Sequence, residues 1–512
     1  MASTSPVTAS SSARRLGHSV GGRLRGWWGT AQQTFGWTPL LIVIGLGIAV
    51  RLYALFAYVP SSLQWIDAIR FARISPSGAF GDVWAPAGYP AFLALLRQIS
   101  NNLSFTIAVQ HLLGLIGGLL IFAAVRRVAP RWVALVPAAV LIVGGDFLFL
   151  ETMIMVEAYF TFTICVTLYA AIRALNDPHP LRWLAFASFA AGMSALVRSN
   201  ALVIPPLIAV WALVVFAGPW RHRALRFVVA LAPALILVVA YLVAANIDGR
   251  YSGLVDARNI DLYGRVAPFA NCTKFTPPKG TERLCQDNIP RGQRPGSFWY
   301  TWVAESPGVK YYGLDPAKNG LLGKWARAAI LGQPLDYAKI VAKDMFRYID
   351  PTAGNDYGFS GLSADGWSFI YRVPAEEQFV GHALGKRYDG VLPAHMPGAQ
   401  ALDFYQTSTR LSGLFLALFS VVTIVGLFLA RGRLWAVLAL FAATAFLLYV
   451  GPVLTISYDV RYGLPPQGPL AAAAALSVWA ILLRVRGSAP GEQELEATDG
   501  AAWGERPLDV AH

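Results

Sequence analysis

The residues best suited to chemistry in this sequence are charged side chains that lie within or beside long apolar runs. Residues 61–75 read SSLQWIDAIRFARIS and follow the apolar run PLLIVIGLGIAVRLYALFAY. A carboxylate can accept a proton, and a guanidinium group can bind phosphate oxygens. On a helix, three-residue spacing places Asp67, Arg70 and Arg73 on one face. The other face carries Trp65, Ile69 and Ala72. We therefore expect an amphipathic helix that lies flat on a lipid surface.

Other charged residues occupy similar positions. A charge within or beside a membrane span is energetically costly unless it is paired or hydrated, so each one is a functional candidate. The set comprises Arg51, Asp146, Glu151, Glu157, Arg198, Asp459 and Arg461. Structural explanations stay open, because Arg51 could extend to lipid headgroups, while Arg198 and Arg461 could neutralise the acids. Glu151 and Glu157 point to different faces of a helix and do not suit a close carboxylate pair.

Several other chemistries lack their sequence patterns. The chain contains no GxxxxGK[ST] phosphate-binding loop, no GxSxG serine motif and no Cys-rich or His-rich metal spacing. Its histidines, among them His111, His382 and His395, are scattered. A divalent metal bound by Asp67 with another acid stays open, because hard cations need only oxygen ligands. The sequence indicates no other cofactor.

The composition is typical of a membrane protein. The 512 residues are 55% hydrophobic and only 14% charged, and the mean hydropathy is +0.48. A soluble protein of this size could not bury so much apolar surface. The net charge of +13 comes from short basic clusters between apolar runs rather than from one basic stripe. This pattern argues against nucleic-acid binding and is typical of basic cytosolic loops.

Ten segments are apolar over about the 20 residues that cross a bilayer. They are residues 39–58, 104–125, 131–150, 153–174, 182–197, 200–217, 225–245, 410–430, 434–456 and 463–484. Basic clusters lie before the first segment and after the second, fourth, sixth, eighth and tenth. With ten crossings and a cytosolic N-terminus, every cluster falls in the cytosol. We therefore expect an all-α polytopic protein whose two termini both lie in the cytosol.

These crossings divide the chain into five regions. They are a disordered cytosolic tail (1–38), a membrane module of about seven helices (39–245), an extracytoplasmic loop region (246–409), the last membrane helices (410–484) and an acidic cytosolic tail (485–512). The first outer loop (59–103) and the turn SYDVRYG (457–463) fall on the same side as the long loop region. All the charged candidates above therefore gather toward the extracytoplasmic face.

The long loop region carries two further predictions. The stretch LLGKWARAAILGQPLDYAKIVAKDMFRYID predicts two amphipathic helices that are broken near Pro334 and lie along the membrane. Cys272 and Cys285 share this polar loop, whereas Cys165 lies in an apolar run. An extracytoplasmic loop favours a Cys272–Cys285 disulfide over two free thiols.

The first motifs resemble those of the multi-spanning GT-C glycosyltransferases that use polyprenyl-phosphate sugars. The resemblance is to the group of the protein O-mannosyltransferases and lipid A aminoarabinose transferases, which is similar to glycosyltransferase family 39. In that family an Arg-Leu pair, here Arg51-Leu52, ends the first span. The first outer loop then opens with D-E-x-x-Y, which reads D-A-I-R-F here. Asp67 is kept, while Ala68 replaces the second acid and Phe71 the tyrosine.

Further motifs follow in the order of the family, and the resemblance extends to about Leu476. AGYPAFLALL resembles the entry to a surface helix, and ARAAILGQPLDYAKIV resembles the surface helix pair that precedes the final spans. ETMIMVEAYFTFTICVTLYAAIRAL resembles the fourth span and places Glu157. GMSALVRSNALVIPPL resembles the Leu-x-Arg segment and places Arg198. DVRYGLPPQGPLAAAAA resembles the R-Y-x-L-P-x-x-P run and places Arg461 and Tyr462.

The resemblance implies transfer of a sugar, with inversion, from a polyprenyl phosphate to an acceptor hydroxyl at the extracytoplasmic face. The acceptor would be a cell-envelope glycan, lipid or protein. Asp67 would take the acceptor proton, and partial desolvation would raise its basicity. Arginines would stabilise the departing phosphate, which needs no general acid. The expected substrate-binding residues are Arg51, Glu157, Arg198, Arg461 and Tyr462.

Three other functions stay open. A polymerase or ligase of lipid-linked glycans would share the compartment and the arginines. A transporter of lipids or solutes would also carry charges in the membrane, but it should place some of them at the midplane or on both sides. A non-catalytic assembly subunit is the third alternative.

Overall fold

The computed structural model describes residues 36–59, 63, 66–73, 80, 82–247, 253–286, 289–314, 319–350, 367–373 and 394–485. Within these ranges the chain is all-α, apart from one isolated bridge between Arg372 and His395. This architecture confirms the predicted fold class. The two predicted tails fall almost entirely outside the described residues, as does Trp65.

Among the described residues, eight helical segments are long and apolar enough to cross a membrane. They are α2 (Thr38–Ala57), α5 (Leu103–Val125), α8 with η2 (Val156–Arg173 and Ala174–Asn176), α9 (Pro180–Val197), α11 (Trp220–Ile247), α18 with α19 (Ala399–Thr409 and Gly413–Leu429), α20 (Gly432–Thr455) and η9 with α21 (Val460–Gly463 and Gln467–Val485). The bent pair α6 and α7 (Arg131–Val143 and Gly145–Thr152) and the shorter α10 (Ile204–Val215) occupy the other two predicted positions. The prediction of about ten spans is consistent with this arrangement.

The two irregular positions have local causes. α6 and α7 meet at a bend of 42°. Gly144 stands between them with extended backbone (φ −61°, ψ 122°), which interrupts the helical hydrogen bonds. α9 ends at Arg198, whose backbone is also extended (φ −150°, ψ 119°), and the short 3-10 helix η3 (Ser199–Val203) follows. This break takes Arg198 out of the span and leaves it at one end of the helix bundle.

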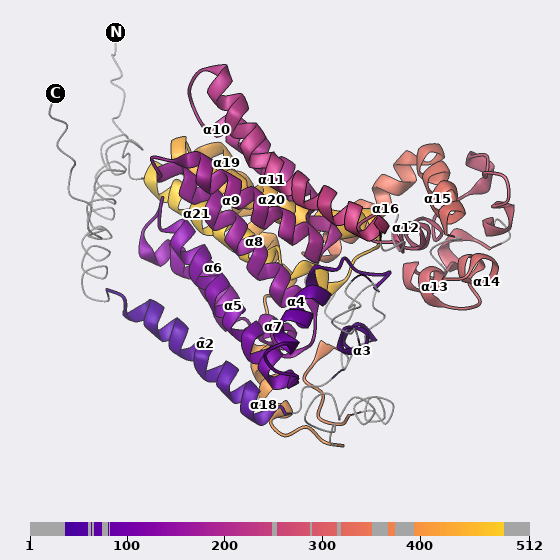
Figure 1. Ribbon diagram of the computed structural model, residues 1–512, viewed down its shortest axis with the longest axis horizontal. Helices are drawn as coiled ribbons and strands as arrows, with labels where there is room; N and C mark the ends of the chain where they lie inside the picture. Colours follow the sequence, from indigo (N-terminus) through magenta and orange to yellow (C-terminus); the bar gives the residue numbers. More distant parts are fainter. Residues whose placement is uncertain are drawn as a thin grey trace, which may run out of the picture.

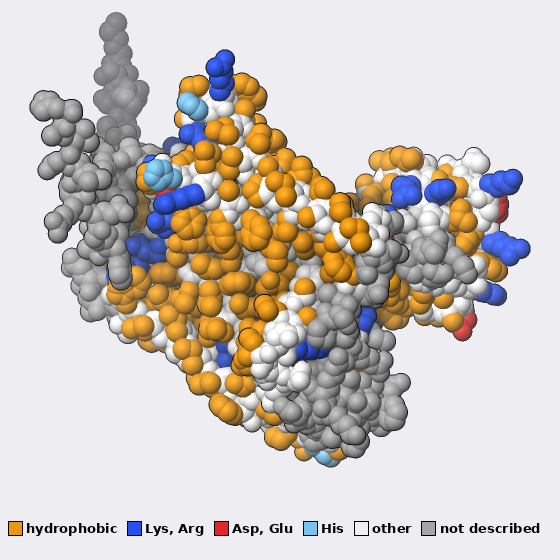
Figure 2. Space-filling view, in the orientation of Figure 1, with side chains coloured by type: hydrophobic (Ala, Val, Ile, Leu, Met, Phe, Trp, Pro, Cys, Tyr) orange, Lys and Arg blue, Asp and Glu red, His pale blue; other side chains and the backbone are white. Residues whose placement is uncertain are grey.

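The membrane helices pack through small residues and keep apolar side chains outside. α9 packs on α8 and α11, α5 on α6 and α8, and α21 on α19, α6 and α20 (Figure 1). At Gly192 of α9 a Cβ atom would lie 2.9 Å from the Cα of Ala234 in α11, so glycine allows this close approach. Figure 2 shows that hydrophobic side chains cover most of the visible helix surface. A lipid bilayer would cover such a surface.

A buried ion network joins α2, α5 and α7 inside the bundle. Arg51 donates from Nε and Nη2 to the two carboxylate oxygens of Glu151, at 2.8 and 2.9 Å. Its Nη1 donates to the carbonyl oxygens of Gly47 and Ile142. The Nδ1 of His111 lies 3.0 Å from Glu151 Oε2. Because Arg51 and Glu151 are each 3% exposed, this pairing is what allows two charges to remain in an apolar interior.

The first outer loop contributes two short helices at one end of the bundle. α3 (Ile66–Arg73) and α4 (Gly88–Arg97) confirm the predicted helical segments. The ring of Phe71 packs edge-on against Tyr89 of α4, with 4.9 Å between ring centroids. Arg97 donates from Nη2 to the carbonyl oxygen of Ala72 at 2.9 Å, near the C-terminal end of α3, where helix carbonyls lack intrahelical donors. These contacts fix α3, and with it Asp67, on the bundle.

The long loop region forms a compact unit that we call the covering region (residues 253–350). Its helices are α12 (Arg258–Val266), α13 (Ser297–Trp302), α14 (Pro307–Tyr312), α15 (Gly320–Gly332) and α16 (Pro334–Arg347). Figure 1 shows this unit at one end of the membrane helices. Its own core is built around Tyr263, Tyr300 and Trp325, which are all fully buried. α15 and α16 confirm the predicted helix pair that breaks before Pro334.

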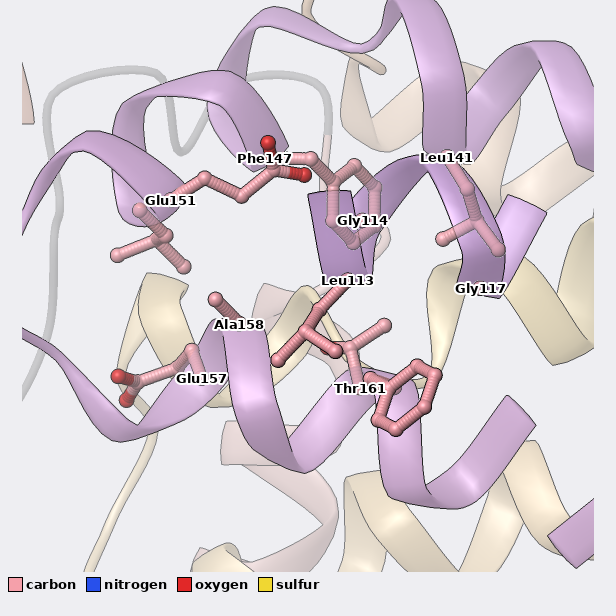
Figure 3. A pocket seen from close by; sticks show the side chains of 11 residues that line it. Leu113, Gly114, Gly117, Leu141, Phe147, Glu151, Glu157, Ala158 and Thr161 are labelled. Carbon is pink, nitrogen blue, oxygen red and sulfur yellow. The ribbon is translucent and has the colours of Figure 1, made fainter. Parts of the chain in front are cut away.

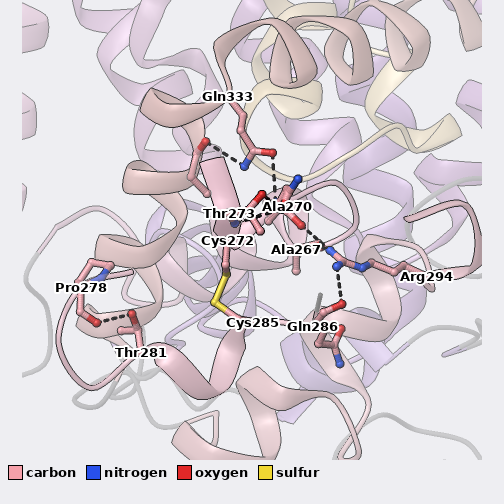
Figure 4. The surroundings of a disulfide bond; sticks show 12 residues. Ala267, Ala270, Cys272, Thr273, Pro278, Thr281, Cys285, Gln286, Arg294 and Gln333 are labelled. Atoms are coloured by element: carbon pink, nitrogen blue, oxygen red, sulfur yellow. Dashed lines mark hydrogen bonds between the residues drawn. A yellow bond between two sulfur atoms is a disulfide. The ribbon is translucent and has the colours of Figure 1, made fainter. Parts of the chain in front are cut away.

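A disulfide and a network of backbone contacts close the loop that precedes α13. Cys272 and Cys285 are bonded, with 5.9 Å between their Cα atoms, as predicted. Arg294 donates to the carbonyl oxygens of Ala270 and Gln286 beside this bond (Figure 4). The bond closes a loop with a sequence separation of 13 residues, which restricts the unfolded chain.

A buried ion pair anchors the covering region to the last membrane helices. Arg265 of α12 donates to Asp344 of α16 at 2.6 Å. The same carboxylate oxygen accepts hydrogen bonds from Ser457 Oγ and the backbone N–H of Tyr458, both at 3.2 Å. Ser457 and Tyr458 directly precede η9, the 3-10 turn that carries Arg461. Asp344 therefore fixes α12 relative to this turn.

The ion network around Arg51 predicts a large effect on stability. Arg51→Leu removes the guanidinium and leaves Glu151 buried without its main partner, which should destabilise the fold by roughly 3–5 kcal/mol. The thermal midpoint of the detergent-purified protein measures this loss. Arg182→Leu is the control, since Arg182 is 60% exposed in its pair with Asp177 and should contribute little. Equal midpoints for the two variants would contradict a structural role for Arg51.

Candidate active site

A cavity of about 340 Å³ lies where the first outer loop, the membrane helices and the covering region meet. Its charged lining residues come from many segments of the chain: Asp67, Arg70, Glu157, Arg198, Arg258, Asp261, Arg327 and Arg461. Aromatic residues also line it, among them Trp84, Trp302 and Tyr462. The fold therefore brings eight charged side chains together in a single pocket, although the first and the last of them are hundreds of residues apart in the sequence.

Asp67 forms ion pairs with two arginines of the cavity. Arg461 donates from Nη1 to Asp67 Oδ2 at 2.7 Å, across a sequence separation of 394 residues. Arg70, one turn along α3, donates from Nη2 to Asp67 Oδ1 at 2.9 Å. Arg70 also pairs with the buried Asp82. Asp67 thus bridges two guanidinium groups while 27% of its side chain stays exposed to the cavity.

Arg461 is held in place by the turn that carries it. Asp459 is fully buried and accepts a hydrogen bond from the backbone N–H of Arg461 at 3.0 Å, which caps the 3-10 turn η9. The Nε of Arg461 is buried and makes no hydrogen bond among the described residues. It lies 3.8 Å from Asp459 Oδ1, close enough for an ion pair but too far for a hydrogen bond. The turn therefore presents a guanidinium group that has an unused donor beside the cavity.

The ionic contacts make Asp67 a weak base, which contradicts one expectation. Desolvation by itself raises the pKa of Asp67, but the charges of Arg461 and Arg70 outweigh it and lower the pKa to about 2. From the sequence, desolvation alone predicts a more basic carboxylate. That prediction was wrong for the ligand-free protein, because the sequence did not show that Arg461 would contact Asp67.

A second ion pair lies beside the first. Arg198 donates from Nη1 to Glu157 Oε1 at 2.6 Å, and the other carboxylate oxygen of Glu157 is buried without a hydrogen bond among the described residues. The guanidinium groups of Arg198 and Arg461 lie 4.4 and 5.0 Å from the ring centroid of Tyr462. Aromatic faces attract cations at such distances, so Tyr462 helps to hold the two arginines together.

Four of the predicted substrate-binding residues line the cavity and one does not. Glu157, Arg198, Arg461 and Tyr462 belong to its wall together with Asp67. Arg51 is absent from this wall and uses its guanidinium group on Glu151 and two carbonyl oxygens.

Asp146, Glu151 and Glu157, the three acids near the junction of the third and fourth predicted spans, each have different partners in the structure. Glu157 joins the cavity, Glu151 joins Arg51, and Asp146 accepts hydrogen bonds from Arg410, Trp367 and Gln406. Figure 3 shows Glu151 and Glu157 on opposite sides of a second, much smaller pocket. The two glutamates therefore do not form a carboxylate pair, as their six-residue spacing predicted.

Sequence reasoning missed the residues that the covering region contributes. Arg258, Asn259 and Asp261 of α12, Arg327 of α15 and Trp302 of α13 all line the cavity. Trp302 packs on Trp84 with 4.3 Å between ring centroids. The stretch RNIDLYGRV has the alternation of an amphipathic helix, which could have predicted α12, but nothing in it indicated which face meets Asp67.

A metal ion receives no support from the side-chain arrangement. The described residues contain no group of three or more His, Cys, Asp or Glu side chains that could hold one. In the cavity, Asp67 and Glu157 are each bonded to an arginine, which competes directly with a cation for the carboxylate oxygens. We therefore assign no step of the chemistry to a metal.

Comparison with protein families gives one match. Residues 85–249 match the model of a family described as dolichyl-phosphate-mannose-protein mannosyltransferase. The matched segment contains Glu157 and Arg198, and the matched family is one of those that the sequence motifs resemble. The match thus confirms that resemblance over this part of the chain. Comparison with curated protein sequences gives no match.

Solved structures show distant likeness over most of the chain. One is the archaeal oligosaccharyltransferase AglB from Archaeoglobus fulgidus in complex with an inhibitory peptide and a dolichol-phosphate, at 11% identity and a TM-score of 0.43, covering 94% of this chain and 53% of that one. Another is ArnT from Cupriavidus metallidurans bound to undecaprenyl phosphate, at 14% identity and a TM-score of 0.35. This match covers 87% of this chain and 78% of ArnT. The chain spans about half the length of the archaeal protein.

The lowered pKa of Asp67 predicts how stability changes in acid. The Asp67 carboxylate has a pKa of about 2 in the folded protein and 3.8 in the unfolded chain, so its ionisation stabilises the fold above about pH 4. This stabilisation is lost as the pH falls from about 4 to about 2. The full contribution is about 2 kcal/mol. Asp67→Asn should therefore lower the thermal midpoint at pH 6, and the gap from the unmodified protein should narrow toward pH 3.

The control for this titration is Asp336→Asn, which breaks the half-exposed pair between Asp336 and Lys274 outside the cavity. It should change the midpoint little at either pH. A gap between Asp67→Asn and the unmodified protein that stays constant from pH 6 to pH 3 would show that Asp67 is not held ionised by its arginines.

Proposed function

We propose that the protein is a membrane glycosyltransferase of the GT-C type, which moves a sugar from a polyprenyl phosphate to an acceptor hydroxyl with inversion. One observation carries the proposal: Asp67 and Arg461 meet in a cavity at one end of the membrane helices, with Arg70 and Arg198 in the same wall. The family-model match over residues 85–249 supports the same class of enzyme.

The cavity is assigned to the extracytoplasmic face. A helix that crosses the membrane has its two ends on opposite sides, and the ends remote from the cavity carry the arginine clusters. These are Arg126 and Arg127 after α5, Arg221, Arg223 and Arg226 around the start of α11, and Arg431 and Arg433 between α19 and α20. Basic residues in short loops mark the cytosolic side. The disulfide in the covering region suits an oxidising compartment.

The arginines suit the phosphate of a lipid-linked donor. A guanidinium group remains charged in a desolvated site and binds phosphate oxygens through two parallel N–H donors. Arg461 has an unused Nε donor, and Arg198 lies beside it across the Tyr462 ring. A phosphate that binds Arg461 competes with Asp67 for the same guanidinium group. Donor binding would therefore release the Asp67 carboxylate from its strongest partner.

The released carboxylate then lies beside the sugar that the phosphate carries. In the transfer step the acceptor oxygen bonds to the anomeric carbon and its O–H bond breaks, with the proton passing to a base in the cavity. The bond from the anomeric carbon to the phosphate oxygen breaks, and the phosphate keeps the electron pair. Positive charge grows on the sugar ring and negative charge on the phosphate. Asp67 stabilises the first and the arginines stabilise the second, in a desolvated site where such interactions are strong. Direct attack inverts the anomeric centre.

The covering region provides the acceptor side of the cavity. α12, α13 and α15 contribute its polar and aromatic wall opposite the membrane helices. The acceptor is a hydroxyl-bearing cell-envelope molecule, either a glycan, a lipid or a protein. A hydroxyl group enters this space from the aqueous side, while the prenyl chain of the donor stays in the bilayer.

The alternative functions differ in how well they suit this cavity. A transporter needs a path between the two sides, whereas the unsatisfied donors and the exchangeable ion pairs described here lie at one end of the bundle. A polymerase or ligase of lipid-linked glycans would use the same cavity. Analysis of the product separates that reaction from transfer of a single sugar.

Asp67→Asn tests the role of the carboxylate. Its loss should lower the transfer rate in proteoliposomes at least 100-fold, because the neutral amide cannot stabilise the positive charge on the sugar. Release of free undecaprenyl phosphate from a panel of radiolabelled undecaprenyl-phosphate sugars measures the rate. Asp336→Asn is the control and should keep full activity. Near-normal turnover in Asp67→Asn, with normal expression, would remove Asp67 from the catalytic role.

Arg461→Lys tests the donor site. Lysine keeps the charge but cannot bind phosphate through two parallel donors, so KM for the donor should rise by roughly tenfold or more. The KM for the acceptor should change much less. Arg182→Lys, at an arginine that is 60% exposed and lies at the opposite end of α9 from Arg198, should change neither value. An equal loss for donor and acceptor would indicate a purely structural arginine.

A further inference from the structure

We propose that Asp261, on α12 of the covering region, is the group that takes the proton from the acceptor. The assignment rests on the proposed transferase function. It gives the two half-buried aspartates of the cavity different roles: Asp67 faces the donor sugar and Asp261 activates the acceptor. Neither the motifs of the sequence nor the matched family segment (residues 85–249) includes Asp261.

The position of Asp261 is fixed by the helix that carries it. Asp261 and Arg265 are four residues apart on α12 and so lie on the same face. Arg265 is anchored through Asp344 to the turn before Arg461. Asp261 lies one turn before Arg265 on this face and lines the cavity together with Asp67. Asp261 is half-buried, so a ligand in the cavity can reach its carboxylate.

Among the cavity carboxylates, Asp261 is the one that is available for proton transfer. Asp67 is bonded to Arg461 and Arg70, and Glu157 is bonded to Arg198. The Asp261 side chain forms no hydrogen bond or ion pair with the other described residues. An acceptor hydroxyl that enters from the covering side can therefore donate a hydrogen bond to Asp261 without displacing a protein partner.

The electrostatic surroundings of the two aspartates also separate their chemistry. Burial and the negative charge of Asp67 raise the pKa of Asp261 to about 7, although Arg70 opposes this shift. The other charged groups that line the cavity are Arg198, Arg258, Arg327, Arg461 and Glu157. A general base works best when its pKa is near the working pH. Two carboxylates whose pKa values are pushed apart are suited to different roles, with the less acidic one exchanging the proton.

The step balances without another reactant. The acceptor oxygen forms its bond to the anomeric carbon as its O–H bond breaks, and the proton moves to Asp261. The bond from the anomeric carbon to the phosphate oxygen breaks, and the polyprenyl phosphate leaves with the electron pair. Protonated Asp261 then releases its proton to water at the cavity mouth, and Asp67 rebinds Arg461 when the polyprenyl phosphate departs.

The test is the pH dependence of donor consumption by Asp261→Asn. The full-length protein in liposomes is given radiolabelled undecaprenyl-phosphate sugars, with water as the acceptor when no other is supplied, and free undecaprenyl phosphate is measured from pH 5.5 to pH 9. A base must be ionised, so kcat/KM of the unmodified protein should rise as the pH increases through about 7. Asp261→Asn should lose this rise and about 100-fold or more of the rate at pH 8.

Folding of the variant does not obscure the result. Because the fold raises the pKa of Asp261, the ionised carboxylate destabilises the protein above its unfolded pKa, and the neutral asparagine should fold at least as stably. Asp403→Asn is the matched control, since Asp403 on α18 is also partly buried and lies outside the cavity. It should keep both the rate and the pH profile.

Two failures can be told apart. If the unmodified protein consumes none of the donors, the proposed function is overturned and the role of Asp261 falls with it. If the unmodified protein is active and Asp261→Asn keeps the rate and the rise near pH 7, only the role of Asp261 is overturned. Thermal shifts with undecaprenyl phosphate should be equal in the variant and the unmodified protein, because Asp261 does not hold the phosphate.

Discussion

The structure depends on the ion pair between Asp67 and Arg461, which joins the first outer loop to the last membrane helix across 394 residues of sequence. Each partner needs support, because a charge at the edge of an apolar bundle is stable only where other groups position and neutralise it. Phe71 and Arg97 hold the helix that carries Asp67. Asp459 and Asp344 hold the turn that carries Arg461. The membrane helices and the covering region thus converge on a single salt bridge.

Buried charges serve two different purposes in this protein. Arg51 and Glu151 satisfy one another through two hydrogen bonds and are closed off from the cavity, so this network stabilises helix packing. In the cavity, Arg461 and Glu157 each keep a buried polar atom without a hydrogen bond among the described residues. Such atoms are costly in the ligand-free state, and a phosphate or a sugar hydroxyl would satisfy them. Structural networks such as those of His111 and Arg265 also keep atoms of this kind, so it is the position of Arg461 and Glu157 in the cavity wall that marks them as binding groups.

The sequence predicted the helices better than it predicted the site. Apolar length located all ten helical positions, and the surface helices on either side of Pro334 followed from their amphipathic pattern. The bend at Gly144 was not predicted, because hydropathy does not report backbone direction. Charge in apolar surroundings and the family motifs identified Asp67, Arg198 and Arg461. They could not show that Arg51 lies outside the site, because its partner Glu151 is 100 residues away in the sequence. They also could not identify Asp261, because a carboxylate in a polar loop is common.

The central claim is that the phosphate of the donor replaces Asp67 at Arg461. The most direct measurement is the affinity of the purified protein for undecaprenyl phosphate, compared with that of Asp67→Asn at pH 7. If the carboxylate and the phosphate compete for one guanidinium group, the inactive variant should bind the lipid phosphate severalfold more tightly, because no ion pair has to break first. Equal or weaker binding by Asp67→Asn would contradict the exchange, and with it the coupling of donor binding to release of the carboxylate.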